Sequence, residues 1–166
     1  PNKRAAPKRW NEGVRSDDAS VRVVHAPLAS GLGDGKSFLF LFGFKRAAKI
    51  ARKAGQMTSI TLSDSSCVER HRESFLDLIR NDIDIVFANE SEIKSLYLTQ
   101  NFDGALRAIQ KDCPIAVLTR SADGCVIVKG DCVHASPAFP VSKVVDVTGA
   151  GDLFAAGFLF GFTAGK

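Results

Sequence analysis

Two kinds of hydrophobic spacing alternate along this chain from about residue 45 onward, and this alternation constrains the fold more than any other feature. Runs with apolar residues at helical spacing are separated by short runs rich in β-branched residues. The spacing predicts helices over residues 45–54, 66–80, 90–98 and 102–110, and strands over residues 57–62, 83–88, 115–119 and 125–128. A helix between two strands allows those strands to pair in parallel. We therefore expect an α/β fold of three layers, with helices on both faces of a mostly parallel central sheet.

A glycine-rich turn near residue 150 separates a β-branched run from an apolar run. Its residues Gly149, Ala150 and Gly151 carry almost no side chain, so their backbone N–H groups can approach an anion closely. Asp152 follows them, and a bound phosphate would repel its carboxylate. That carboxylate needs another use, such as taking a proton from an attacking hydroxyl. The turn therefore predicts a phosphoryl-transfer site, with Asp152 as the base beside an anion hole.

A purely structural interpretation of the same turn remains open. Asp146 or Thr148 could cap the helix that follows, Asp152 could complement the dipole of that helix, and the glycines could serve a tight turn. Each feature alone is explained well in this way. Their occurrence together favours phosphoryl transfer.

The helix expected after the turn, over residues 153–162, is apolar on nearly all sides. This pattern predicts a helix buried in the core, where it would hold the anion hole rigid. The segment is too short and too interrupted by glycine to span a bilayer, which needs about 20 apolar residues.

Residues 146–159 resemble the second signature of the ribokinase-like (PfkB-type) family of sugar and nucleoside kinases at every constrained position. Residues 86–92 are similar to the family's Asn-x-x-Glu element, and residues 117–124 to its nucleotide-contacting strand and turn. Residues 61–72 are most similar to the adenosine-kinase-like branch. Over residues 46–166, the resemblance implies a ribokinase-like fold and an ATP-dependent kinase that phosphorylates a hydroxyl of a nucleoside or sugar, with an adenosine-kinase-like activity favoured.

The resemblance also implies a role for each matching residue. Asp152 would deprotonate the acceptor hydroxyl, and Asn89 with Glu92 would organise Mg²⁺ and its waters near the phosphates of ATP. Glu92 would act on the metal through water. Contacts on the nucleotide side are implied for Thr119, Arg120 and Gly124. A cytoplasmic location and a homodimer of the full-length enzyme are further implications.

This chain departs from the family pattern in two ways. Ser121 stands where the turn after the Thr-bearing strand usually has its first glycine. The family's first glycine-rich signature and its β-sheet lid are not recognised in residues 1–44, a basic extension that does not match the family. We therefore expect a partial nucleotide-binding domain over residues 45–166. Because the chain starts at Pro1 and its only methionine is Met57, we expect a truncated or incomplete chain.

Basic residues are concentrated toward the N-terminus: residues 1–53 carry a net charge of +8 and residues 54–166 carry −4. Such a cluster could attract nucleic acid or an acidic membrane. Before residue 38 only Trp10 supplies an aromatic residue, and no nucleic-acid-binding motif accompanies it. We therefore expect a disordered, solvated tail and no nucleic-acid or membrane partner.

The four cysteines form no C-x-x-C pair, and three of them lie in or beside apolar runs. This usage predicts buried, reduced thiols in a cytoplasmic protein and argues against zinc and disulfides. The three histidines show no spacing typical of a metal site or a catalytic triad. No signal-peptide pattern follows Pro1.

Two alternatives to a kinase remain. Residues 30–37 end like a Walker A loop, but Ser30 replaces the required first glycine and no suitable magnesium-binding aspartate follows. Residues 38–42 are also a poor start for the amphipathic helix that such a loop needs, so a P-loop nucleotidase is a minor alternative. The main alternative is a non-catalytic nucleotide-binding or interaction fragment.

Overall fold

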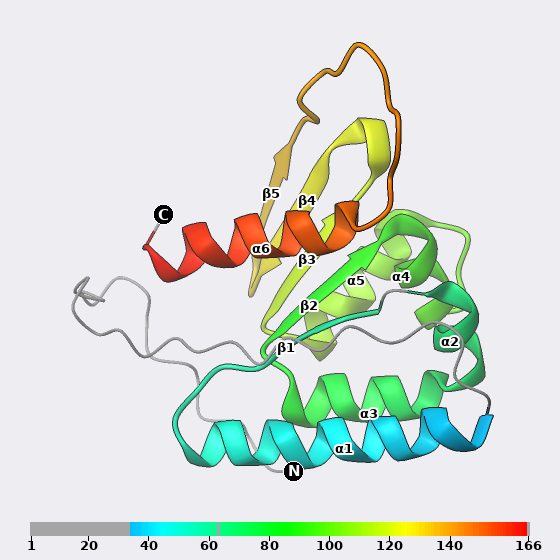
Figure 1. Cartoon of the computed structure of the whole chain (residues 1–166), viewed down its shortest axis with the longest axis vertical. Coiled ribbons are helices and arrows are strands. Elements are labelled where there is room, and N and C mark those ends of the chain that lie inside the picture. The colour runs from blue at the N-terminus through cyan, green and yellow to red at the C-terminus, as the bar shows by residue number, and fades with distance from the viewer. Residues whose placement is uncertain (1–33, 63, 166) are drawn as a thin grey trace.

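The computed structural model describes residues 34–62 and 64–165, with side chains from residue 43 onward. These residues form a five-stranded sheet with helices on both faces (Figure 1). The strands are β1 (Ser59–Thr61), β2 (Ile85–Asn89), β3 (Ile115–Thr119), β4 (Cys125–Lys129) and β5 (Cys132–Ser136). The helices are α1 (Asp34–Lys53), α2 (Ser65–Arg70), α3 (Arg72–Asp82), α4 (Glu90–Leu96), α5 (Phe102–Asp112) and α6 (Ala150–Thr163), with a 3₁₀ turn η1 (Ser121–Asp123). The expected basic tail and residues 30–33 lie outside the described residues.

The strands lie in chain order across the sheet. The pairs β1–β2 and β2–β3 are parallel, as the helix-strand alternation predicts. The pairs β3–β4 and β4–β5 are antiparallel because only short turns, without a crossover helix, join these strands. The predicted α/β class is confirmed. Strand β5 was not predicted, and its residues are mostly exposed at the edge of the sheet.

Two helices differ from their predicted bounds. Helix α1 begins at Asp34, well before residue 45, and includes residues 38–42, which we expected to be a poor helix start. The predicted helix over residues 66–80 is divided at His71, whose backbone leaves the helical region at φ −120° and ψ 24°. The division between residues 44 and 45 as a domain boundary remains a prediction.

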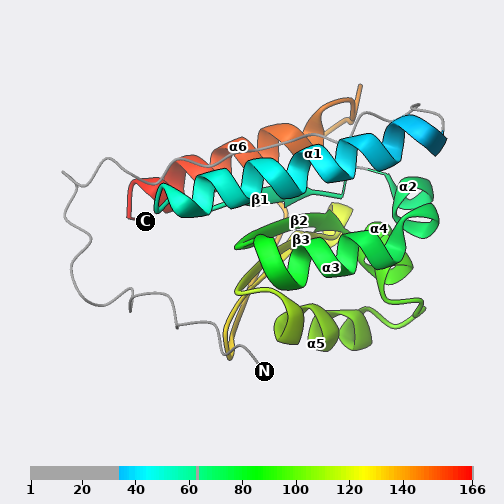
Figure 2. The ribbon, with the colours of Figure 1, turned by 90° about the horizontal axis from the view of Figure 1, so that it is seen from below.

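Helices lie on both faces of the sheet (Figure 2), and an apolar core lies on each face. On β2, Val86 and Ala88 contribute to a core formed with helices α2 to α5, whereas Ile85 and Phe87 contribute to a smaller core with α6. Strand β3 alternates in the same way. Because both faces of these strands are buried, their sequences are nearly continuous apolar runs, and this explains why they were predictable.

Helix α6 contradicts the expectation of a helix buried on all sides. Only Ala155 is buried, while Leu153 and Phe160 are 75% and 74% exposed. One side of the helix packs on the sheet through Phe158, whose ring lies 5.5 Å from that of Phe87 in an edge-to-face arrangement. No described element covers the opposite side. None of the described helices is long and apolar enough to cross a membrane.

The thiols agree with the prediction in three cases out of four. Cys67, Cys113 and Cys125 are buried, whereas Cys132 is exposed because it lies on the edge strand β5. None of the four forms a disulfide bond in the described structure.

Candidate functional site

The predicted site residues follow the ends of two neighbouring parallel strands. Asn89 ends β2, Thr119 ends β3, and the two residues lie directly opposite each other in the sheet register. Helix α6 crosses the sheet with its N-terminus toward this same edge (Figures 1 and 2). The structure therefore brings the strand ends and the glycine-rich turn to one edge of the sheet, where ligands bind in open α/β folds.

The glycine-rich turn begins α6 with a left-handed residue. Gly149 is the N-cap, with φ +74°, a conformation that disfavours any side chain. The N–H of Ala150 donates to the carbonyl of Val147 at 3.0 Å, so it is already used. In the part of the chain that the structure describes, the N–H groups of Gly149 and Gly151 have no such acceptor. Two of the three predicted anion-hole donors are therefore available to a ligand.

The carboxylates around this turn have different roles. Asp146 accepts a hydrogen bond from the backbone N–H of Thr148 at 2.8 Å, and this bond holds the pKa of Asp146 below its usual value. Neither residue caps α6, because Gly149 occupies the cap position. Asp152 lies exposed in the first helical turn, and its carboxylate has no partner among the described residues. Asp152 is thus available to an incoming hydroxyl.

Asn89 and Glu92 form a reciprocal capping box at the start of α4. The side-chain oxygen of Asn89 accepts from the N–H of Glu92 at 2.9 Å. The carboxylate of Glu92 accepts from the N–H and from the Nδ2 of Asn89, at 2.9 and 2.6 Å. Burial raises the pKa of Glu92, which is only 6% exposed. These hydrogen bonds cap α4, so the pair has a structural role, and any role toward a metal must be additional to it.

The site fits ATP better than it fits a directly bound metal. Free backbone N–H groups at a helix N-terminus suit a phosphate. Both oxygens of Glu92 already accept hydrogen bonds, and no group of three or more His, Cys, Asp or Glu side chains in the described residues could hold a metal ion. Mg²⁺ normally keeps several waters and binds through substrate phosphates. The residues present therefore fit Mg²⁺ only through water, with Glu92 acting indirectly.

The turn between β3 and β4 contains two left-handed residues. Ser121 has φ +50° at the position where the family usually has glycine, so a residue with a side chain holds a strained conformation there. Gly124 has φ +86°, and a Cβ atom built on it would lie 2.6 Å from the backbone N of Ala138. Gly124 therefore has a structural reason to be glycine, because the segment after β5 passes directly against it.

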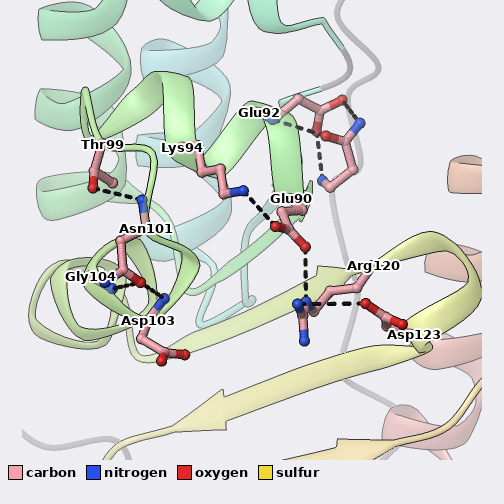
Figure 3. Close-up of polar contacts among 10 residues, drawn as sticks. Glu90, Glu92, Lys94, Thr99, Asn101, Asp103, Gly104, Arg120 and Asp123 are labelled. Carbon is pink, nitrogen blue, oxygen red and sulfur yellow. Dashed lines mark hydrogen bonds and ion pairs between the residues drawn. The ribbon is translucent and has the colours of Figure 1, made fainter.

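Arg120 is held by protein groups on several sides (Figure 3). Its Nε lies 2.9 Å from the carboxylate of Glu90, and its Nη2 lies 3.7 Å from that of Asp123. The guanidinium carbon lies 4.3 Å from the centroid of the Phe102 ring. Arg120 thus connects the end of β3 to the start of α4 and to α5.

An open hollow of about 850 Å³ lies beside these residues. It is lined by Glu69, Asn89, Glu90, Ser91, Lys94, Ser95, Leu98, Thr99, Gln100, Arg120 and Ser121. The hollow includes two predicted site residues, Asn89 and Arg120, but no residue of the turn at 149–152. It is therefore not the predicted phosphate site, which lies on the open surface at the start of α6.

Three residues of this region were missed in the sequence. Glu90 and Lys94 form an ion pair at 2.6 Å one helical turn apart, and their spacing of four residues was a readable signal. Phe102 and Glu90 both contact Arg120 from segments distant in the sequence. No sequence pattern could have indicated these contacts.

The chain belongs to the PfkB family of ribokinase-like kinases. The sequence profile of the family, described as pfkB family carbohydrate kinase, matches residues 40–166, well over half of the chain. This match confirms the predicted family, and it includes the turn at 149–152 and the capping box.

Solved structures and curated sequences give more particular similarities. The chain is similar to an adenosine kinase from Sinorhizobium meliloti (49% identity, TM-score 0.73), over 75% of this chain and 38% of that one. It is also similar to a probable sugar kinase protein from Rhizobium etli CFN 42 (51% identity, TM-score 0.72), over 74% and 38% of the two chains. An uncharacterized sugar kinase from Archaeoglobus fulgidus is 39% identical over 92 residues, 55% of this chain and 36% of that protein. The chain thus spans less than half the length of each, and the predicted ribokinase-like fold is confirmed for that part.

Proposed function

We propose that this chain is the nucleotide-binding part of a kinase that transfers the γ-phosphoryl group of ATP to a hydroxyl of a nucleoside or sugar. The observation that carries the proposal is the turn at 149–152. It presents free N–H groups and an unpaired carboxylate at the sheet edge where Asn89 and Thr119 end their strands. An anion hole beside a free carboxylate is what phosphoryl transfer to a hydroxyl requires.

Asp152 takes the proton of the acceptor hydroxyl as that oxygen bonds to the γ-phosphorus of ATP, while the bond from that phosphorus to the bridging oxygen breaks and ADP leaves. The N–H groups of Gly149 and Gly151 stabilise the charge on the transferring phosphoryl oxygens, and Ala150 joins them only if its bond to Val147 opens. When bound, Mg²⁺ supplies charge neutralisation at the phosphates.

Asn89 and Glu92 would hold Mg²⁺ from the capping box through water. Thr119, Arg120 and Gly124 form the nucleotide side of the site, in the turn that follows β3.

Adenosine is the favoured acceptor. It is suggested by residues 61–72 and by the similarity to the adenosine kinase from S. meliloti, although a sugar kinase protein is equally similar. A cytoplasmic location and a homodimer of the full-length enzyme remain predictions.

A second candidate is a fragment that binds nucleotide without catalysis. It is favoured by the 38% share of the S. meliloti enzyme that the chain covers. Incubation of the chain with ATP, Mg²⁺ and a panel of nucleosides and sugars distinguishes the two: phosphorylated product supports the kinase, and ADP binding without product supports the fragment.

The test of the base is Asp152→Asn. We expect product formation to fall by a factor of about 10² to 10⁴, because general-base catalysis is lost, while ADP affinity stays within about twofold. Asp131→Asn, the same change at an exposed position in the β4–β5 turn, is the matched control and should retain activity. Near-normal turnover of Asp152→Asn would show that another group is the base.

A further inference from the structure

Glu90 is shared between two cations at the rim of the hollow. One carboxylate oxygen lies 2.6 Å from Nζ of Lys94, and the other lies 2.9 Å from Nε of Arg120 (Figure 3). The ion pair with Lys94 is local to α4, whereas the pair with Arg120 joins segments 30 residues apart. Contacts with Lys94 and then Arg120 hold the pKa of Glu90 below its usual value, so Glu90 is charged at neutral pH. Only the second pair therefore restrains the turn after β3.

The turn Arg120–Gly124 is restrained from within by its backbone and by the ion pair of Arg120 with Asp123. Its backbone is closed by three hydrogen bonds: Arg120 N–H to Gly124 at 2.8 Å, Asp123 N–H to Arg120 at 2.9 Å, and Gly124 N–H to Ser121 at 3.2 Å. Ser121 and the residues up to Asp123 are exposed, and Ser121 is strained by its positive φ. A strained, exposed turn depends on contacts from outside it to remain in one conformation.

Arg120 supplies one such contact, and the packing of Gly124 against residues 136–138 supplies another. Its guanidinium pairs with Glu90 and covers the ring of Phe102, while its own N–H and carbonyl groups close the turn. The side chain of Arg120 is 30% exposed, as is that of Glu90, so the ion pair is only partly screened by water. Immobilising this side chain therefore also immobilises the backbone at the base of the turn.

We propose that Glu90 is a positioning residue, which holds the turn Arg120–Gly124 at the nucleotide side through its ion pair with Arg120. This inference rests on the proposed function, because the turn matters for activity only if it contacts nucleotide. In this role Glu90 acts through Arg120 and the backbone of the turn. Loss of the pair raises the entropic cost of ordering the turn when nucleotide binds, so it weakens binding without changing the chemical step.

The experiment compares Glu90→Gln with the unaltered chain in two measurements. Amide hydrogen exchange at Asp123 and Gly124, without nucleotide, reports the order of the turn. Titration calorimetry with ADP and Mg²⁺ reports affinity. We expect exchange about fivefold faster and ADP binding about fivefold weaker, in line with a partly exposed ion pair. Both effects should shrink as salt is raised.

Two control variants isolate the proposed pair. Glu69→Gln makes the same change at another residue that lines the hollow. Glu69 accepts a hydrogen bond from the hydroxyl of Ser95 and is not paired with Arg120. Lys94→Met breaks only the local pair on α4. Both controls should leave exchange at Asp123 and Gly124 within about twofold of the unaltered chain. An equal effect of either control would overturn the specific role of the Glu90–Arg120 pair.

The outcomes separate this proposal from the function on which it rests. Unchanged exchange in Glu90→Gln overturns the positioning role, whatever the ADP result. Faster exchange with unchanged ADP affinity also overturns it, because the turn would then not serve the nucleotide. Absence of ADP binding by the unaltered chain would instead contradict the proposed function, while the exchange data would still measure the restraint on the turn.

Discussion

At the scale of single residues, the site depends on a few glycines and polar groups whose neighbours are distant in the sequence. Gly124 illustrates this, because the resemblance to kinases suggested a nucleotide contact whereas the structure gives a packing reason. The segment after β5 passes so close that a Cβ atom would overlap backbone atoms of residues 136–138. A glycine can therefore match a family motif because no side chain fits at its position, as well as because it contacts a ligand.

This close approach predicts a large loss of stability in Gly124→Ala. We expect the free energy of unfolding to fall by more than about 2 kcal/mol, since the new atom meets backbone rather than a flexible side chain. Gly130→Ala is the matched control: Gly130 also has a positive φ, +55°, but nothing lies within 4 Å of its Cβ position. Its loss should be only about 1 kcal/mol. Urea denaturation of both variants measures the difference. Equal losses of stability would show that the positive φ, and not the overlap with backbone, accounts for the effect.

At the scale of elements, the start of α4 shows how a structural motif and a candidate site can use the same residues. The capping box satisfies the first N–H groups of the helix and places Glu92 in a buried position. Burial raises the pKa of Glu92, so the carboxyl group of Glu92 binds its proton more tightly in the folded chain than in the unfolded chain. The free energy of unfolding therefore falls as the pH rises above 4.5, the ordinary pKa of a glutamate, and this loss of stability persists at neutral pH.

Substitutions of Glu92 test this sign. At pH 7, the free energy of unfolding of Glu92→Gln should lie within about 1 kcal/mol of that of the unaltered chain, because glutamine removes the buried charge and keeps one acceptor. Glu92→Ala removes the cap, so its free energy of unfolding should fall by about 1–2 kcal/mol. As the pH is lowered from 7 toward 4, the unaltered chain should gain stability relative to Glu92→Gln. Thermal unfolding over this range measures the difference. A gap between the two proteins that does not change with pH would contradict the raised pKa.

At the scale of the whole molecule, the two faces of the sheet are covered unequally. Among the described elements, helices α2 to α5 enclose a large core on one face, whereas α6 packs on the other and its outer side is exposed. Apolar residues of the segment before α6 are exposed as well, among them Phe139 and Val145, which are 89% and 86% exposed. Apolar patches of this kind are unusual on a soluble monomer.

The uneven cover predicts that the chain binds a hydrophobic dye such as ANS in its native state. Phe160→Gln, on the outer side of α6, should lower ANS fluorescence with little change in the free energy of unfolding, because Phe160 is 74% exposed. Phe158→Gln makes the same change on the inner side, where Phe158 contacts Phe87, and should cost about 2 kcal/mol or more. Equal losses of stability would mean that the outer side is also packed.

Much of the fold could be predicted because its signals are local. The buried runs of β2 and β3 and the amphipathic spacing of α5 follow directly from the order of residues, and the family match confirms the predicted family. The break at His71 and the exposed strand β5 were missed, because neither leaves a clear hydrophobic period. The burial predicted for α6 was wrong. An apolar sequence favours burial of a helix, but burial also requires another element that packs against it.

Most of the helix-strand order and the glycine turn before Asp152 could be predicted from the sequence, since each rests on residues close together in the chain. The pairing of Arg120 with Glu90, the close approach of the segment after β5 to Gly124 and the exposed side of α6 arise from tertiary packing. These contacts join segments far apart in sequence. Their strength depends on distance and burial, which arise only when the chain is packed.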